Sequence, residues 1–160
     1  MKPRNYRVKR NMSYTRREYI TRIPDSRIVK FTMGNPARKF EAKIRLVTLK
    51  SGQIRNQALE AARIAANRYL ELHLGRSNYK FKIVPYPHQI LRTKKRTMVA
   101  QADRFQEGMK LAYGSPAGVA ARMKKRKTVL TVEVMEKDVQ IGRDALKRGA
   151  DKLPLPCRVI

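Results

Sequence analysis

The sequence predicts an α+β fold: a two-layer sandwich in which a mostly antiparallel sheet carries two helices on one face. Short segments alternate apolar and polar residues with period two, and two longer segments repeat at three- and four-residue steps. Their order is strands, helix, strands, helix, strand, which favours helices gathered on one side of the sheet. Hydrophobic residues make up 42% of 160 residues, enough for one core. We expect a single domain over 27–160 after a basic arm over 1–26, with the open face of the sheet presenting lysines and arginines.

The arm alternates cations with tyrosines and has little apolar periodicity. A solvated, disordered arm is one interpretation. We favour an arm that orders against RNA, with arginines on phosphates and tyrosines stacking on bases or sugars. Its candidate RNA-binding residues are Arg4, Arg7, Lys9, Arg10, Tyr14, Arg16, Arg17 and Arg22.

Two strands are expected next, over 27–33, where Val29, Phe31 and Met33 share a face, and over 43–49. A helix over about 53–72 follows, ended by Gly75. Its expected core stripe is Ile54, Ala58, Ala61, Ala65, Tyr69 and Leu72. Its opposite face mixes both charges and should be solvated; it carries Asn56, Glu60, Arg63, Asn67 and Glu71. Arg68 lies beside the stripe and either covers the sheet edge with its aliphatic part or reaches a phosphate.

The strand over 79–83 should point Tyr79, Phe81 and Ile83 inward and its lysines outward, and prolines stop it. Residues 92–113 then form a long basic loop, a length that is usually functional or disordered in a compact domain. We expect this loop to serve function and to add little stability. Its candidate residues are Arg92, Lys94, Lys95, Arg96, Arg104 and Lys110.

The last third begins with a glycine-rich turn over 114–118, a short apolar segment and a basic turn over 122–127. A strand over 128–134 and a helix over about 138–153 follow, with Asp138 as a plausible N-cap. Gly142 and Gly149 border the apolar stripe of this helix, which indicates close packing against the sheet or the first helix. Residues 157–160 could add a final short strand.

The charge balance points to nucleic acid. Lysine plus arginine number 38 and aspartate plus glutamate 12, a net charge of +26. Such a domain repels itself unless counter-charge arrives, and phosphate backbones are the densest source. Further candidate RNA-binding residues are Lys80, Lys82, His88, Arg122, Lys124, Lys125 and Arg126.

Other locations and partners fit less well. The sequence has no apolar run near the roughly 18 residues of a spanning helix and no signal peptide. The single Cys157 cannot form an internal disulfide, which fits a reducing compartment, so we expect a cytoplasmic protein without a membrane partner.

We recognise no catalytic motif in the sequence. Gly114-Ser115-Pro116-Ala117-Gly118 is neither a phosphate-binding loop nor a nucleophile elbow. One cysteine and two distant histidines, His73 and His88, give no metal constellation. We therefore expect no metal, cofactor or small-molecule substrate. Two rival functions stay open: an RNA-modifying enzyme, and a chromatin-type DNA-binding protein, although no groove-entering motif is recognisable.

Several sequence motifs are more specific than the composition and indicate a protein family. They are Tyr14-Thr15-Arg16-Arg17-Glu18-Tyr19-Ile20, Met33-Gly34-Asn35, Asn56-Gln57-Ala58-Leu59-Glu60-Ala61-Ala62-Arg63, Pro87-His88, Ala102-Asp103-Arg104 and Tyr113-Gly114-Ser115-Pro116-Ala117-Gly118-Val119-Ala120-Ala121-Arg122. Together they resemble the large-subunit ribosomal protein ten-e family of archaea and eukaryotes, homologous to bacterial large-subunit protein sixteen.

The resemblance implies a structural protein of the large ribosomal subunit, not an enzyme. It further implies binding to ribosomal RNA near the aminoacyl-tRNA site, with the loop over 92–113 directed toward tRNA. The implied partners are large-subunit ribosomal RNA, aminoacyl-tRNA and other ribosomal proteins. The family's glycine-rich patch before Ala-Asp-Arg is replaced here by Met98-Val99-Ala100-Gln101, which predicts a stiffer loop.

Overall fold

The computed structural model describes residues 6–8, 18, 20, 22–93 and 114–160. Within them lie two α-helices and eight strands, which confirms the expected α+β class. The strands are β1 (Thr32–Gly34), β2 (Ala42–Thr48), β3 (Gly52–Arg55), β4 (Lys80–Ile83), β5 (Gln89–Thr93), β6 (Ser115–Met123), β7 (Thr128–Val134) and β8 (Cys157–Val159). The helices are α1 (Asn56–Leu74) and α2 (Val139–Ala150), the latter preceded by a short 3-10 turn over Glu136–Asp138.

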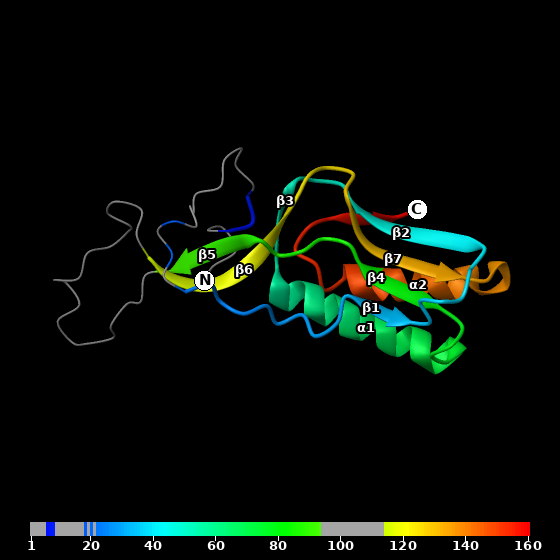
Figure 1. The fold of residues 1–160 in the computed structure, drawn as a ribbon. Helices are drawn as coiled ribbons and strands as arrows, with labels where there is room; N and C mark the ends of the chain where they lie inside the picture. The colour runs from blue at the N-terminus through cyan, green and yellow to red at the C-terminus, as the bar shows by residue number, and fades with distance from the viewer. Residues whose placement is uncertain (1–5, 9–17, 19, 21, 94–113) are drawn as a thin grey trace, which may run out of the picture.

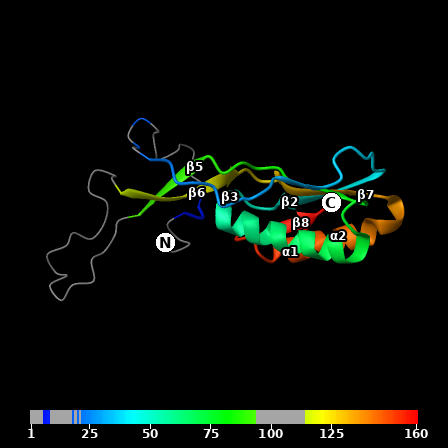
Figure 2. The same cartoon turned by 60° about the horizontal axis from the view of Figure 1, so that its bottom comes forward.

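Five strands form the main sheet in the order β1-β4-β7-β2-β8, and every neighbouring pair is antiparallel. Helices α1 and α2 pack against each other and cover one face of this sheet (Figures 1 and 2). Alternation along the strands directs Leu46, Phe81 and Leu130 into the layer between sheet and helices, where each is buried. Among the described residues, no helix covers the opposite face of the sheet (Figure 2).

Both glycines of α2 lie at its contacts. A Cβ on Gly142 would stand 2.6 Å from the Ile44 Cδ1 atom of the sheet. A Cβ on Gly149 would stand 3.1 Å from Leu130 Cδ1 and 3.4 Å from the Ala62 carbonyl oxygen of α1. The expected close packing is confirmed, and Gly149 meets both the sheet and the first helix.

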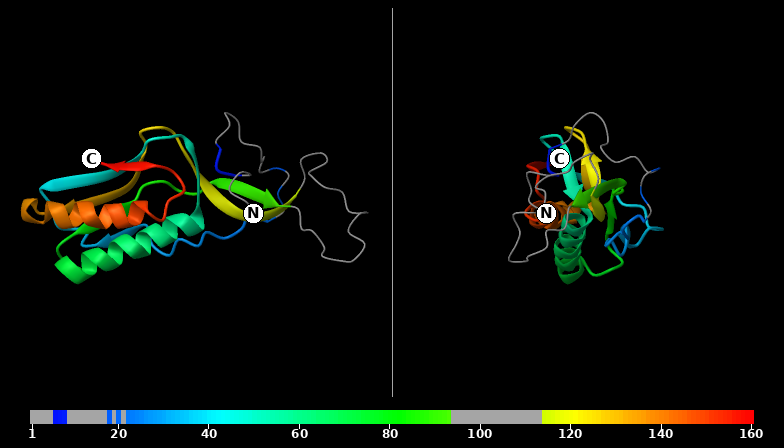
Figure 3. Two further views of the ribbon diagram at one scale, coloured as in Figure 1. Left: turned by 180° about the vertical axis from the view of Figure 1, so that it is seen from behind. Right: turned by 90° about the vertical axis from the view of Figure 1, so that its left-hand side faces the viewer.

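A second, three-stranded sheet has the order β3-β6-β5 and extends away from the helical layer (Figures 1 and 3). The chain passes between the two sheets in four places: from β2 to β3, from β3 through α1 to β4, from β4 to β5 and from β6 to β7. The sequence had predicted one sheet, because β3 and β5 are short and stand beside turn or loop residues. The expected turn over 114–118 is wrong, since these residues belong to β6 or directly precede it.

The expected core stripe of α1 is only partly right: Ala58 and Tyr69 pack against the core, but they lie at the edge of the buried stripe. The buried residues of this helix are Asn56, Leu59, Ala62, Ala66 and Leu70, while Leu72 is 80% exposed. Ile54 is buried, but it belongs to β3. The first expected strand is shorter than predicted and starts at Thr32, and Arg92 and Thr93 belong to β5 and not to a loop.

Several predictions are confirmed. In β4 and the residue before it, Tyr79, Phe81 and Ile83 are buried, while Lys80 and Lys82 lie on the opposite face. The strand over 128–134, the C-terminal strand and Gly75 as the cap of α1 are also as predicted. Asp138 is the N-cap of α2, although its side chain makes no capping hydrogen bond.

Candidate nucleic-acid interface

The open face of the five-stranded sheet is basic. Register places Lys82 of β4 beside Thr131 of β7, and Thr131 beside Arg45 of β2. Because paired residues of neighbouring strands point to the same face, these side chains form one row. We call the cations on this surface the outer basic face; its members are Lys43, Arg45, Lys80, Lys82 and Arg158.

One carboxylate lies among these cations. Glu133 of β7 accepts ion pairs from Lys43 at 2.8 Å and from Lys80 at 3.4 Å. The hydrogen bond from Lys43 is the main cause that holds the pKa of Glu133 below its usual value. Glu133 therefore balances part of the charge of two lysines, while the face as a whole keeps an excess of positive charge.

The turn between β6 and β7 holds a second group of cations. Lys124, Lys125, Arg126 and Lys127 are all exposed. Hydrogen bonds with the buried Thr48 fix the backbone of this turn. The Thr48 hydroxyl donates a hydrogen bond to the Lys124 carbonyl over 2.8 Å. The Thr48 carbonyl accepts from the Arg126 amide at 2.7 Å, and the Thr48 amide donates to the Lys127 carbonyl at 3.0 Å. The turn thus presents four cations from a defined backbone.

Arg126 has a positive φ of 61°. This left-handed conformation costs a residue with a side chain roughly 1–2 kcal/mol relative to the usual helical conformation. A glycine would avoid this cost. The turn instead has an arginine at this position, which adds a fourth cation to it.

The third basic element is the hairpin of β5 and β6. Gln89 pairs with Ala120 at one end, and Thr93 pairs with Ser115 at the other. Arg92 lies on β5 opposite Pro116, close to the point where the pairing ends. The described residues that flank the segment 94–113 are therefore held next to each other by the pairing of β5 with β6. This segment and its candidates Lys94, Lys95, Arg96, Arg104 and Lys110 lie outside the described residues.

A short piece of the N-terminal arm contacts the second sheet. The carbonyl of Arg7 accepts a hydrogen bond from the Gln53 amide at 2.9 Å, and the Tyr6 carbonyl accepts one from Gln53 Nε2 at 2.8 Å. The Arg55 guanidinium lies over the Tyr6 ring, 5.5 Å from its centroid. Arg7 and Arg22 are exposed. The other arm candidates, Arg4, Lys9, Arg10, Tyr14, Arg16 and Arg17, lie outside the described residues.

Aromatic rings follow the outer basic face. Burial alternates through the segment after β4: Pro85 and Pro87 are buried, while Tyr86 and His88 are exposed. The Tyr86 ring stacks on Phe31 with centroids 5.5 Å apart and planes 20° apart. The His88 ring lies 4.5 Å from Tyr86 in a tilted arrangement. His88, a candidate RNA-binding residue, therefore lies on this exposed segment.

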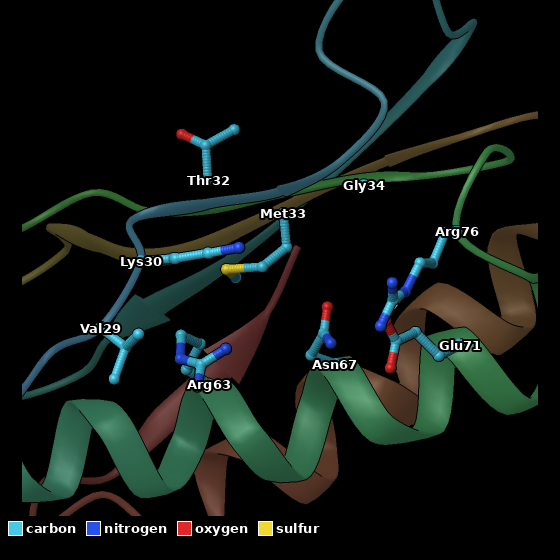
Figure 4. A pocket seen from close by; sticks show the side chains of 9 residues that line it. All are labelled: Val29, Lys30, Thr32, Met33, Gly34, Arg63, Asn67, Glu71 and Arg76. Carbon is cyan, nitrogen blue, oxygen red and sulfur yellow. Dashed lines mark hydrogen bonds and ion pairs between the residues drawn. The ribbon is translucent and has the colours of Figure 1, made fainter.

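A polar cavity of about 430 Å³ lies between residues 29–34 and α1. Figure 4 shows Arg63 and Asn67 rising from α1 toward this segment. Arg63 pairs with Glu60 through two hydrogen bonds, of 2.8 and 2.6 Å, and Arg76 pairs with Glu71 at 2.8 Å. Because these guanidinium groups are already matched by carboxylates, the cavity is a structural seam and a poor site for an anion.

The prediction that this face of α1 is solvated is wrong, because several of its residues line the same seam. Asn67 accepts a hydrogen bond from the buried Tyr79 hydroxyl at 2.8 Å, and burial raises the pKa of Tyr79 to about 12. The side chains of Glu60 and Arg63 are each only 14% exposed. Mixed charge on this face reflects ion pairs with neighbours and not contact with bulk water. Arg68 is exposed.

The predicted RNA-binding residues therefore fall into separate groups. Lys80 and Lys82 lie on the outer basic face, and Lys124, Lys125 and Arg126 in the exposed turn. Arg122 lies on β6 opposite Gln53 and is only partly exposed. Sequence reasoning missed Lys43, Arg45, Arg158, Phe31 and Tyr86. Alternation along the predicted strands contained the signal for the first two, because both point away from Ile44 and Leu46.

Other kinds of site find no support in the part of the chain that the structure describes. There, no group of three or more histidine, cysteine, aspartate or glutamate side chains could hold a metal ion. Among the same residues, no helix is long and apolar enough to cross a membrane.

Comparison with known proteins identifies the family. The family model described as ribosomal protein L16p/L10e matches residues 9–160. A Staphylothermus marinus protein named large ribosomal subunit protein uL16 is 48% identical over 147 residues, covering 92% of this chain and 84% of that protein. Proteins of the same name from Methanosphaerula palustris and Methanococcus maripaludis are 46% and 40% identical, each covering at least 97% of this chain and 90% of the relative. Because the matches cover nearly the whole chain, this protein belongs to the ribosomal protein L16p/L10e family.

Proposed function

We propose that this protein binds large-subunit ribosomal RNA through the outer basic face and the exposed turn over 124–127, near the aminoacyl-tRNA site, and helps to position tRNA. Family membership makes the chain a structural constituent of the ribosome and not an enzyme. The observation that carries the RNA-binding proposal is the outer basic face, which has five cations and one carboxylate, Glu133, paired with two of them.

The physical reason is electrostatic. A net charge of +26 disfavours the compact state until counter-charge neutralises it. Phosphate groups supply that counter-charge, and contacts to them position a protein on RNA without reading its sequence. The cations of the exposed turn suit such contacts because hydrogen bonds from Thr48 fix their backbone.

Affinity for large-subunit RNA fragments, measured at several salt concentrations, tests this proposal. Each phosphate contact should contribute roughly −0.7 to −0.9 to the slope of log affinity against log salt. We expect a steep negative slope that becomes shallower when Lys82 and Arg45 are both replaced by alanine. A slope near zero for the unmodified chain would contradict RNA binding through phosphates. The position of a tagged chain in a ribosome gradient is the independent cellular check.

The N-terminal arm is assigned a supporting role in the same binding. Its arginines and tyrosines should order on RNA. Removing residues 1–24 should therefore weaken RNA affinity much more than stability, because the known contacts of Tyr6 and Arg7 are a few hydrogen bonds to Gln53, each worth about 1 kcal/mol. If the truncated chain fails to fold, the arm belongs to the domain.

The tRNA part of the proposal concerns the segment between β5 and β6. The family resemblance suggests that Arg92, Lys94, Lys95, Arg96 and Arg104 contact tRNA phosphates. Since Thr93 and Ser115 are paired, a short Gly/Ser linker can replace residues 94–113 without moving either strand. We expect normal incorporation into the large subunit and weakened aminoacyl-tRNA binding. Unchanged tRNA affinity in assembled subunits would contradict the tRNA role while leaving the ribosomal RNA role intact.

A further inference from the structure

Two exposed rings, Tyr86 and His88, continue the outer basic face beyond the end of β4, and Phe31 stacks on Tyr86. The outward-facing residues alternate along this segment: Lys80 is partly exposed, and Lys82, Val84, Tyr86 and His88 are exposed. The first two are cations and the last two are rings. A surface of this kind combines charge that attracts a phosphate backbone with rings on which bases can stack.

The rings are held in place before any ligand arrives. Buried Pro85 and Pro87 flank Tyr86, and proline fixes its own φ and restricts the residue before it. The Ile83 amide donates to the Phe31 carbonyl at 2.8 Å, which ties the segment carrying Phe31 to the end of β4. Phe31 then supports Tyr86 from one side by stacking, with centroids 5.5 Å apart. Because the rings are already held in place, little conformational entropy is lost when a ligand binds.

Among the described residues, two of these rings stay exposed. Tyr86 is 52% exposed, although the core nearby buries Phe81 and Tyr79 completely. His88 is also exposed, and its ring lies 4.5 Å from Tyr86. An exposed stack of rings beside cations is the recognised way in which proteins hold unpaired bases of RNA.

We propose that Phe31, Tyr86 and His88 form a stacking platform for an unpaired nucleobase of single-stranded or looped RNA, with Lys82 near the adjoining phosphate. This inference rests on the proposed RNA binding and adds to it a contact that depends on a base and not only on phosphates. Every base has a face that can stack, so the platform should tolerate any of the four bases.

The chain contains no tryptophan, which allows a direct test. Tyr86→Trp places the protein's single indole on the platform of the full-length chain, and Leu72→Trp places it on the exposed surface of α1 as the matched control. The probes are a short oligoribonucleotide and an abasic oligomer of the same length and charge. Anisotropy reports binding of each oligomer, and tryptophan fluorescence reports stacking.

We expect the oligoribonucleotide to quench the fluorescence of Tyr86→Trp strongly, the abasic oligomer to quench it little, and neither to quench that of Leu72→Trp. Tyr86→Ala should bind the oligoribonucleotide about 5- to 150-fold more weakly than Tyr86→Phe, which keeps the ring. Binding of the abasic oligomer should be equal for both. Equal quenching by both oligomers, or equal affinity of the alanine and phenylalanine variants, would overturn the platform while RNA binding stands. If the unmodified chain binds neither oligomer, the proposed RNA binding and the platform are both overturned.

Discussion

Thr48 and Lys124 lie 76 residues apart in the sequence, and the Thr48 hydroxyl donates a hydrogen bond to the Lys124 carbonyl over 2.8 Å. The bond joins the end of β2, in the five-stranded sheet, to the turn through which the chain leaves the three-stranded sheet. It therefore fixes both the exposed basic turn and the connection between the two sheets.

Replacing Thr48 with valine should lower the free energy of unfolding by about 1 kcal/mol, because valine keeps the shape but removes a buried donor. Urea unfolding measures this change. Thr48→Ser keeps the hydroxyl and should retain the turn contact. If valine costs nothing, the backbone hydrogen bonds of Thr48 hold the turn without the hydroxyl.

Replacing Arg126 with asparagine should weaken RNA affinity without loss of stability. Asparagine tolerates the positive φ of 61° better than most residues, and it removes one cation. Thermal unfolding and the salt dependence of RNA affinity measure the two effects, and the slope should become shallower by roughly 0.7–0.9 if one phosphate contact is lost. Arg126→Lys serves as the charge-conserving control. A slope unchanged by the asparagine variant would show that Arg126 contacts no phosphate.

Replacing Gly142 with valine should destabilise the fold by about 1–3 kcal/mol, because the added side chain overpacks the contact with Ile44. The matched control is Gly118→Val on β6, where an added Cβ meets nothing within 4 Å and valine suits a strand. Denaturant midpoints compare the two variants. Equal stability of both would contradict the close approach of α2 to the sheet.

The pKa of Glu133 should lie below its usual 4.5, and Lys43→Ala should raise it more than Lys80→Ala, because the Lys43 hydrogen bond is the main cause of the shift. Carbon-13 NMR of the side-chain carboxyl measures this pKa. A depressed folded-state pKa means that the interaction stabilises the fold above the unfolded-state pKa and is lost as the pH falls through the folded-state pKa. A larger pKa change in Lys80→Ala than in Lys43→Ala would show that Lys80, and not Lys43, makes the main contact with Glu133.

Strand patterns of the sequence were reliable where large side chains alternate with charged ones. Tyr79, Phe81 and Ile83 form such a pattern, and all three are buried as predicted. The helix α1 shows where a pattern fails. Alanines at 58, 61, 62, 65 and 66 allow two overlapping stripes, and composition alone does not choose between them. The choice is made by Leu59 and Leu70, whose larger apolar surfaces are buried against the sheet.

The second sheet was not predictable for a different reason. Strand β3 has four residues between a turn and a helix, too few to show a period of its own. Strand β5 ends in Arg92 and Thr93, whose polarity resembles that of the loop after it. The aromatic platform was missed because Phe31 and Tyr86 are 55 residues apart, and a hydrogen bond from the Ile83 amide to the Phe31 carbonyl brings their segments together. Candidates in the arm and in the segment 94–113 remain predictions.

The order of the five-stranded sheet also bears on aggregation. Its two edge strands, β1 and β8, have three residues each, while the central β7 and β2 have seven. An edge strand exposes unpaired backbone groups to which another chain can add, and short edges limit that risk. The edge strand β3 is partly covered by residues 6–8 through the hydrogen bond between Gln53 and Arg7. The short edges of the main sheet and the cover over β3 therefore limit the backbone to which a second chain could add a strand.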